Sequence, residues 1–395
     1  MPRLPRLPRL PALLIAMMAL HAAASAAPTS ILFVGNSYTF GRVDPVMSYN
    51  AAKVHDLTAS FNALSSTGSN PWEPHPWGGI AGIFKQMTDE SGLDYDVSIS
   101  ARNASTLRGH FLNTANAAWD LRGNVASKKW DTVVLQEQSD AALPAGKGKN
   151  ANLAQFNAYA DQLERFIHNG AAQSYTETAL YGSLAACQAA GNTTTSCNTV
   201  RNIGANTNAS ASTQVYLTET WARPDMVYSH LITKADPNTS DGRPIVDTSS
   251  AGGAATLYYN SLGAMTQDLH ADFAATAARN LNFAGVIQVG DAFQAAVDQM
   301  QVKSGGFYKA DGTYSTPSLG DPMNLWWDDY LHASKYGSYL DALVQFGTIT
   351  RLNPLSLGLD EKAARDLGIG SADAATLQRI AAQQLAYSTT PSPSA

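Results

Sequence analysis

The sequence predicts an α/β protein, a flavodoxin-like three-layer α/β/α sandwich with a central parallel sheet. Short apolar runs alternate with longer segments of helical periodicity along the chain, and this alternation is typical of parallel strands joined by crossover helices. The first apolar run ends in Gly35-Asn36-Ser37, as expected for a buried strand that delivers a side chain to the carboxyl edge of the sheet. Hydrophobic residues, at 45%, suffice for a large core.

The predicted strands and helices follow one another in a regular order. The strands are 31–34, 97–100, 132–136, 215–218 and 286–289. The helices are 80–88, 152–168, 257–281 and 292–301. A further helix is predicted after Ser334, which is a suitable N-cap, because apolar and aromatic residues follow at helical spacing over 336–344.

Four segments are too polar, or too rich in Gly, Ser, Asn and Pro, to belong to the sheet. They are 48–79, 140–150, 189–212 and 233–254. None carries a core-sized apolar pattern, so we interpret them as surface insertions rather than as a second domain. The main domain is therefore predicted over 27–353. It is followed by a helical extension over 354–386, with helices predicted at 360–367 and 371–385. The last segment, 387–395, is expected to be a disordered tail.

The first 26 residues have the organisation of a secretory signal peptide. Three arginines precede an apolar stretch over 10–20, and Ala24-Ser25-Ala26 provides a small-residue cleavage site. The apolar stretch is about half of the roughly 20 residues that a membrane span needs, although a retained anchor is the alternative. We therefore expect a secreted or periplasmic mature protein with no stable membrane insertion.

The composition limits the partners of the chain. Acidic residues outnumber basic ones, 32 to 26, and no basic cluster follows the N-terminal region, which argues against nucleic acid and anionic membrane surfaces. No motif indicates a metal, nucleotide or phosphate site, so we expect no cofactor, and we expect a monomer. Cys187 and Cys197 are predicted to form a disulfide that contributes at most about 2.5 to 3 kcal/mol by loop-closure entropy.

Three residues could activate a hydroxyl for acyl transfer. Ser37 follows the first strand, and Asp329 precedes His332 by three positions near the end of the chain. An unassisted serine is too weakly acidic to attack an ester near neutral pH, whereas a histidine can accept its proton and an aspartate can orient that histidine. Alternatively, Ser37 only caps a helix and His332 is structural. The adjacent Asp328 is interpreted as a solvated or capping carboxylate.

The pairing of Gly35-Asn36-Ser37 with Asp329-x-x-His332 resembles the SGNH hydrolase superfamily, also called GDSL esterases and lipases. The blocks at 33–39 (Phe-Val-Gly-Asn-Ser-Tyr-Thr) and 130–139 (Trp-Asp-Thr-Val-Val-Leu-Gln-Glu-Gln-Ser) are most similar to a poorly characterised bacterial branch. The Gly-x-Ser-x-Gly elbow of α/β-hydrolases is absent around Ser37. The resemblance covers residues 30 to 353 and implies Ser37 as nucleophile, His332 as general base and Asp329 as the residue that orients it.

The resemblance also implies an oxyanion hole, in which this sequence departs from the family. The expected donors are the Ser37 N–H, a glycine N–H from a second block and an asparagine side chain from a third. The second block offers Ala104 instead of glycine, and the third offers Gln136 and Gln138. Strand alternation would place both glutamines in the crevice, and we favour Gln138, although both could merely tie loops together. His110 is expected to support the site.

Three further residues are candidates for the substrate pocket. Trp221 and Arg223 follow the fourth predicted strand, and Trp327 lies just before the catalytic acid. Trp221 could stack on a sugar ring, whereas core packing of the indole and a surface salt bridge of the arginine are the alternatives.

These observations predict an exported serine esterase that acts on a small-molecule or polysaccharide ester. Short acyl esters, above all O-acetyl groups on carbohydrate, are favoured because the resemblance includes many carbohydrate deacetylases. A lipid esterase or lysophospholipase is one alternative, although it would need a continuous apolar cleft. A non-catalytic glycan-binding protein on the same fold is the other, suggested by the altered second block.

Overall fold

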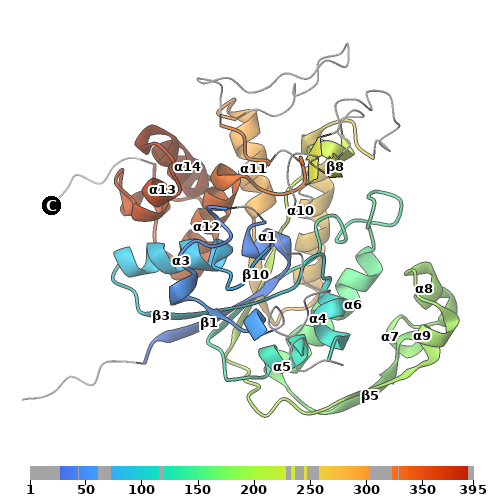
Figure 1. Cartoon of the computed structure of the whole chain (residues 1–395). Helices are drawn as coiled ribbons and strands as arrows, with labels where there is room; N and C mark the ends of the chain where they lie inside the picture. Colours follow the sequence, from blue (N-terminus) through green and yellow to red (C-terminus); the bar gives the residue numbers. More distant parts are fainter. Residues whose placement is uncertain are drawn as a thin grey trace, which may run out of the picture.

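A six-stranded parallel sheet forms the centre of the molecule (Figure 1). The computed structural model describes residues 27–42, 44–60, 73–114, 120–227, 233–235, 244–246, 258–302, 323–327 and 329–389. The strands lie in the order β10 (Phe283–Ile287), β7 (Gln214–Thr218), β4 (Thr132–Gln136), β1 (Thr29–Gly35), β3 (Tyr95–Ala101) and β2 (His55–Asp56). Each neighbouring pair is parallel. Without β2 this is the flavodoxin-like order, in which ligands bind at the carboxyl ends of the strands, so the predicted fold class is confirmed.

The apolar run 31–34 forms the middle of β1, and its four residues are fully shielded from solvent. Because β1 lies between β3 and β4 and helices cover both faces of the sheet, no position on the strand needs a polar side chain. All five predicted strands are present, although β10 begins at Phe283 and Val289 already belongs to the next helix.

The prediction that segment 48–79 lies outside the sheet is wrong. Its residues His55–Asp56 form β2, which pairs with β3 at the edge of the sheet. An edge strand of two polar residues has one unpaired side and no apolar pattern, so its sequence carries no strand signal. Segment 233–254 contributes β8 (Thr233–Ala235) and β9 (Pro244–Val246), which pair antiparallel away from the main sheet.

Helices form the two outer layers (Figure 1). One layer contains α3 (Gly79–Glu90) and α12 (Lys335–Thr350). The other contains α4 (Leu107–Leu112), α5 (Leu121–Val125), α6 (Leu153–His168) and α10 (Leu262–Arg279). Two helices start at the carboxyl edge of the sheet, namely α1 (Ser37–Phe40) and α11 (Val289–Asp298). As predicted, Ser334 caps α12, because its hydroxyl accepts from the N–H groups of Tyr336 and Gly337.

The C-terminal helices pack against the main layers. They are α13 (Lys362–Asp366) and α14 (Ser371–Gln384), and Figure 1 shows both beside α12. Leu377 and Ile380 of α14 are fully buried, and Gln378 Nε2 donates to the Tyr339 hydroxyl of α12 at 3.1 Å. Both helices predicted after residue 354 are therefore present; α14 packs against α12, and α13 packs against α3 and α14.

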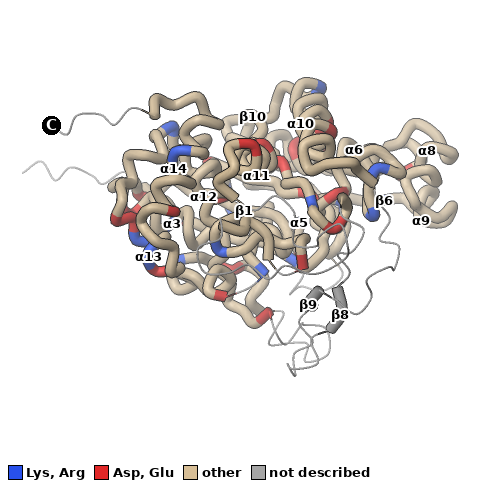
Figure 2. The backbone as a smooth tube through the Cα atoms, turned by 90° about the horizontal axis from the view of Figure 1, so that it is seen from above, with Lys and Arg blue, Asp and Glu red and all other residues tan. Residues whose placement is uncertain are grey.

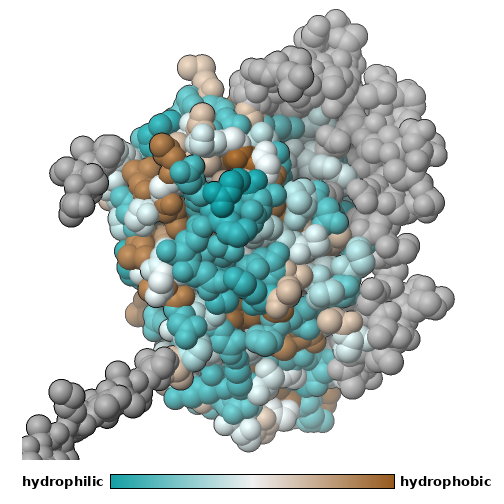
Figure 3. All heavy atoms as spheres, turned by 60° about the vertical axis from the view of Figure 1, so that its left-hand side comes forward, coloured by the Kyte–Doolittle hydropathy of each residue, from teal (hydrophilic) through white to brown (hydrophobic). Residues whose placement is uncertain are grey.

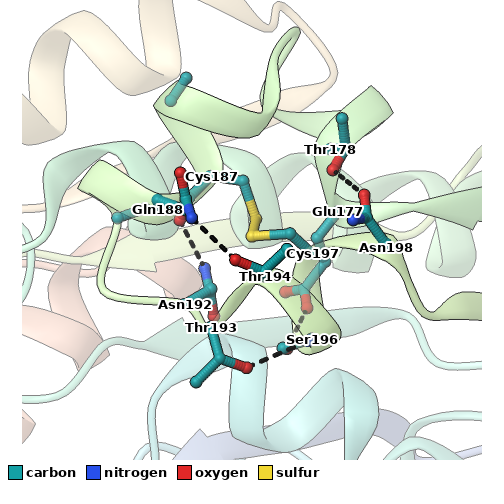
Figure 4. Close-up of a disulfide and its surroundings, with 12 residues drawn as sticks. Glu177, Thr178, Cys187, Gln188, Asn192, Thr193, Thr194, Ser196, Cys197 and Asn198 are labelled. Carbon is teal, nitrogen blue, oxygen red and sulfur yellow. Dashed lines mark hydrogen bonds between the residues drawn. A yellow bond between two sulfur atoms is a disulfide. The ribbon is translucent and has the colours of Figure 1, made fainter.

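A small lobe extends from the layer that contains α6 (Figure 1). It consists of β5 (Gln173–Thr176), α7 (Glu177–Leu180), α8 (Leu184–Ala189), α9 (Thr194–Asn198) and β6 (Val200–Ile203). The predicted disulfide is confirmed, since Cys187 of α8 is bonded to Cys197 of α9 (Figure 4). Side-chain hydrogen bonds between Gln188 and Thr194 and between Thr178 and Asn198 reinforce the same junction.

Glu177 anchors this lobe to the rest of the molecule. Its buried carboxylate accepts a bidentate pair of hydrogen bonds from Arg108 of α4, at 2.6 and 2.8 Å, and a bond from Arg201 at 2.9 Å. Although burial by itself raises the pKa of Glu177, these donors hold that pKa at about 2. The carboxylate therefore stays ionised, as a charge-assisted anchor requires.

The surface is mixed in charge and polarity. Lys and Arg residues are interspersed with Asp and Glu (Figure 2), and on the face drawn in Figure 3 hydrophobic residues form separate patches among hydrophilic ones. None of the helices in the described ranges is long and apolar enough to cross a membrane. The predicted signal peptide and most of the predicted tail lie outside those ranges.

Candidate active site

Hydrogen bonds from two neighbouring strand ends fix the turn that carries Ser37. Asn36 caps the helix that begins at Ser37, because its Oδ1 accepts from the Tyr38 N–H at 3.1 Å. The backbone N–H of Asn36 donates to Gln136 Oε1 at 3.0 Å, and its Nδ2 donates to the Ser105 carbonyl oxygen at 2.9 Å. Asn36 therefore ties the turn to the end of β4 and to the loop after β3.

Gly35 allows this turn to pack closely. A Cβ at Gly35 would lie 2.0 Å from Thr39 Oγ1 and 2.5 Å from Gln136 Oε1, so any other residue would displace the turn. The Gly35 carbonyl oxygen accepts from His110 Nε2 at 2.7 Å. Burial lowers the pKa of His110 to about 4, so its ring is neutral near pH 7. This contact fits the supporting role that was expected of His110.

Asp329 organises the loop that carries His332. Its Oδ1 accepts from the backbone N–H groups of Leu331, at 3.0 Å, and of His332, at 2.9 Å. Its Oδ2 lies 2.5 Å from His332 Nδ1. The three-residue spacing thus lets one carboxylate hold both the backbone and the ring of the same histidine. Tyr330, between them, is buried with a φ of +54°, a left-handed conformation that tightens the loop.

The structure brings Ser37, His332 and Asp329 together in one chain of hydrogen bonds. His332 Nε2 lies 2.8 Å from Ser37 Oγ, and all three residues are buried. With the Nδ1 proton directed at Asp329, the lone pair of Nε2 faces the hydroxyl. This arrangement can move a proton from the serine to the imidazole, which is the first requirement for nucleophilic attack by the oxygen.

Electrostatics favour the neutral imidazole. Burial lowers the pKa of His332 below its usual value, Asp329 opposes this shift, and the positive charges of Arg42 and Arg223 add to it. Burial alone would raise the pKa of Asp329, but its interactions with His332 and the two backbone N–H groups hold that pKa below its usual value. An ionised Asp329 beside a neutral His332 is the state that a general base needs.

Tyr38 and Trp221 hold the His332 loop against the turn. The Tyr38 hydroxyl donates to the Leu331 carbonyl oxygen at 2.9 Å, and Trp221 Nε1 donates to the same oxygen at 3.0 Å. The two rings stack at 3.9 Å, and Phe293 covers the other face of Trp221 at 4.9 Å. The prediction that Trp221 stacks on a sugar is therefore wrong, because both faces of this buried indole are occupied.

Arg223 also belongs to the interior, so its predicted contact with substrate is wrong. Its Nη1 lies 2.8 Å from Asp140 Oδ1, its Nε lies 3.0 Å from Asp225 Oδ1, and its side chain is 4% exposed. Ion pairs with two carboxylates occupy the guanidinium at the carboxyl edge of the sheet. Trp327 is only partly buried beside the His332 loop and remains a candidate pocket residue. Asp328 lies outside the described residues.

The amide of Gln136 is held by hydrogen bonds at the turn. Its Oε1 accepts from the Asn36 N–H and from Thr39 Oγ1 at 2.9 Å, and its Nε2 donates to the Glu137 carbonyl oxygen. The reverse orientation of the amide would set donor against donor, so these bonds fix the orientation of the amide and use one of the two protons on Nε2. Because β4 ends at Gln136, the alternation that placed both glutamines on one face does not extend to Gln138.

Three candidate oxyanion donors have no hydrogen-bond partner in the described part of the chain. They are the backbone N–H groups of Ser37 and Ala104 and Nε2 of Gln138, whose Oε1 is buried and likewise has no partner in that part of the chain. Ala104 has a φ of +55°, a conformation that glycine adopts at less cost, which accounts for the glycine that the resemblance leads one to expect there. Ala104 precedes Ser105, whose carbonyl oxygen accepts from Asn36 Nδ2, so the loop that carries Ala104 is tied to the turn of Ser37.

The roles of Asn36, Tyr38 and Glu137 were not predicted. Glu137 is buried, and its Oε1 accepts from the backbone N–H groups of Leu107, at 3.2 Å, and Gln138, at 2.6 Å. Burial raises the pKa of Glu137 to about 8. Glu137 thereby joins the second block to the third. All three residues lie inside the recognised blocks, which was the available signal, but each also bonds to a residue that is distant in the sequence, namely Ser105, Leu331 and Leu107.

The chain shows only distant similarity to known proteins. No protein-family model and no curated protein matches the chain. Similar solved structures include a candidate SGNH hydrolase from Slackia heliotrinireducens, with 16% identity and a TM-score of 0.35 over 82% of this chain and 99% of that one. A DUF4886 family protein from Bacteroides uniformis has 11% identity and a TM-score of 0.40 over 91% and 95%. A phospholipase A1 from Streptomyces albidoflavus has 12% identity and a TM-score of 0.35 over 82% and 99%. Similarities of this strength carry no argument about this chain, and its fold is established by the strand order and pairing described above.

Proposed function

We propose that this protein is an exported serine esterase that hydrolyses short acyl esters through an acyl-enzyme intermediate. The observation that carries the proposal is the hydrogen-bonded chain from Ser37 Oγ to His332 Nε2, at 2.8 Å, and from His332 Nδ1 to Asp329 Oδ2, at 2.5 Å. A serine esterase needs these contacts, a neutral base and donors for the oxyanion. The proposed donors for the oxyanion are the backbone N–H groups of Ser37 and Ala104 and the Gln138 amide.

The proposed reaction has two stages. His332 Nε2 accepts the Ser37 proton while Oγ attacks the ester carbonyl, and Asp329 stabilises the imidazolium that forms. The N–H groups of Ser37 and Ala104 and the amide of Gln138 donate to the oxyanion. Collapse of the intermediate releases the alcohol, which takes the proton from His332. Water then attacks the acyl group on Ser37 in the same way, releasing the acid and restoring the hydroxyl.

The proposed natural substrate is an O-acetylated carbohydrate. This part of the proposal rests on the resemblance to SGNH deacetylases. The aromatic side chains add little support for a sugar pocket, because Trp221 lies in the core and Trp327 is the one candidate of the two that remains. Export and a monomeric state belong to the same proposal. The Cys187–Cys197 disulfide fits an oxidising compartment.

Covalent labelling and an ester panel together test the function. A fluorophosphonate probe should label the purified protein at Ser37, as located by peptide mass spectrometry. Acetate release from acetylated polysaccharides and from nitrophenyl acetate should exceed the hydrolysis of longer nitrophenyl esters. Labelling with a preference for long acyl chains would instead indicate a lipid esterase. A folded protein that is neither labelled nor active would be a binding protein, and the proposal would be wrong.

The pH dependence of kcat/KM should reflect the lowered pKa of His332. The reaction needs the neutral imidazole, and a lowered pKa keeps the imidazole neutral to lower pH, so activity should persist as the pH falls and be lost only below the usual histidine pKa of about 6.5. We expect the acid limb of the profile to have its midpoint below that value, measured with an ester that does not itself ionise.

The control for this profile is the circular dichroism of the protein over the same pH range, which separates protonation of the base from unfolding. An acid-limb midpoint at or above about 6.5 in the folded protein would contradict the assignment of a buried, charge-neutral base.

Replacing Gln138 with alanine should lower kcat by roughly 10² to 10³-fold with little change in KM, because an oxyanion donor acts mainly in the transition state. Gln136→Ala is the matched comparison, and it should lower kcat less. Its main expected effect is a decrease of about 1 to 3 kcal/mol in the free energy of unfolding, since it leaves the buried Asn36 N–H without an acceptor.

Steady-state kinetics and denaturant unfolding of both variants distinguish these roles. If Gln136→Ala lowers kcat more than Gln138→Ala, the roles of the two glutamines are reversed. If neither variant lowers kcat appreciably, backbone N–H groups alone form the oxyanion hole.

A further inference from the structure

A second cluster of polar side chains lies where β7, α10 and α11 meet. Glu219 follows β7 directly, His270 lies on α10, and Asp291 lies in the first turn of α11. His270 Nδ1 lies 2.8 Å from Asp291 Oδ2 and 3.6 Å from Glu219 Oε2. One potential ligand atom from each residue lies within 4.8 Å of the other two. The cluster shares no residue with the proposed triad.

Glu219 is the unusual member of this cluster. Its side chain is completely shielded from solvent, and neither carboxylate oxygen makes a close hydrogen bond within the described ranges, although the backbone N–H and the carboxyl group of Asp291 lie near enough to interact with it. The side chain packs against Gly290, where a Cβ would come within 2.6 Å of Glu219 Oε1. Such a carboxylate needs either a cation or a shared proton for compensation.

We propose that Glu219, His270 and Asp291 bind one divalent metal ion, for which Zn²⁺ is the best fit. Zinc accepts imidazole nitrogen and carboxylate oxygen at about 2.0 to 2.2 Å, so the ligand atoms of a tetrahedral site are about 3.4 Å apart. The separations of 2.8 and 3.6 Å measured from His270 Nδ1 lie on either side of that value. Magnesium and calcium prefer all-oxygen shells, so the imidazole disfavours them.

The surroundings leave room to complete the coordination shell. His270 and Asp291 line an open surface cavity of about 420 Å³, together with Gln267, Gln294 and other polar residues. Water can therefore reach the remaining coordination positions, and a metal ion can enter from solvent.

A metal ion here would join the end of β7 to both helices. Two residues beyond Asp291 on α11, Phe293 stacks on Trp221, which in turn stacks on Tyr38 beside the proposed nucleophile. The ion would brace this packing without contacting the reacting atoms. The inference does not depend on the proposed esterase activity.

Zn²⁺ titration calorimetry on the tag-free mature protein, treated with chelator and dialysed, tests the site. The parent should bind one Zn²⁺ per chain, and Glu219→Gln and His270→Ala should each weaken that binding at least tenfold. His55→Ala is the matched control, because His55 has a single carboxylate neighbour, Asp96, at 3.2 Å. This variant should bind Zn²⁺ like the parent.

Two results would overturn the proposal. One is a folded parent that binds no Zn²⁺, with Glu219→Gln unfolding at the same or a higher temperature, which would mean that Glu219 and Asp291 merely share a proton. The other is Zn²⁺ binding that survives both substitutions, which would place the ion elsewhere. If Glu219→Gln fails to fold, His270→Ala decides the question, since the His270 side chain is 46% exposed and its loss should not prevent folding.

Discussion

Replacing Ser37 with alanine is expected to lower kcat for ester hydrolysis by about 10⁴-fold or more while the variant folds and is exported normally. The Ser37 hydroxyl is the group that His332 Nε2 contacts at 2.8 Å, so the substitution removes the attacking oxygen itself. The turn should persist, because Asn36 caps the helix through the Tyr38 N–H and makes no side-chain bond to Ser37. Turnover of nitrophenyl acetate, with circular dichroism of both proteins, gives the comparison.

Ser174→Ala is the matched control for this substitution. The Ser174 hydroxyl donates to Asn202 Oδ1 at 2.9 Å on the exposed surface of the small lobe that contains the disulfide, so loss of this hydroxyl should leave kcat unchanged. If Ser37→Ala kept activity within tenfold of the parent, Ser37 would not be the nucleophile and another group would have to be sought.

Replacing Asp329 with asparagine should lower kcat by about 10⁴-fold, as expected when the carboxylate of a triad is removed without loss of shape. The asparagine oxygen can still accept from the backbone N–H groups of Leu331 and His332, so the loop should keep its conformation. Its amide nitrogen would then face His332 Nδ1 and donate to it. The imidazole proton would move to Nε2, which could no longer accept the proton of Ser37.

The neighbouring carboxylate of Asp328 provides the control for this variant. Asp328→Asn should retain parent activity, because only Asp329 has the three-residue offset from His332. Kinetics and thermal unfolding of both variants distinguish loss of the base from loss of the fold. Equal losses of kcat in the two variants, or a near-normal kcat in Asp329→Asn, would count against the assigned role.

Local patterns predicted the strands and long helices well. The apolar runs that form β1, β4 and β7 are buried on both faces of the sheet. Such strands need an apolar side chain at nearly every position, so a short apolar run in the sequence is enough to predict them. His55–Asp56 of β2 was missed because pairing with β3 alone holds it in the sheet. The short helices of the disulfide lobe were missed for a similar reason, since disulfide and hydrogen-bond contacts rather than an apolar face hold them.

The proposed triad could be identified from the spacing of its residues, whereas the contacts and orientations of the surrounding side chains could not. Asp329 and His332 are three positions apart, so the sequence nearly fixes their contact. Whether Trp221 faces a pocket or the core depends on Tyr38 and Phe293, which approach it from distant parts of the chain. The orientation of Gln136 likewise depends on a partner about one hundred positions away.

The contacts of Gly35 and Asn36 bear on whether this site could be moved to another protein. Gly35 and Asn36, at the carboxyl end of β1, form hydrogen bonds with His110, Ser105 and Gln136. These partners lie 75, 69 and 100 positions away in the sequence. Grafting the heptapeptide that contains the serine onto a different scaffold would transfer the nucleophile without the groups that set its geometry. The portable unit is therefore the sheet edge formed by β1, β3 and β4, and a designer would have to transplant all three strand ends at once.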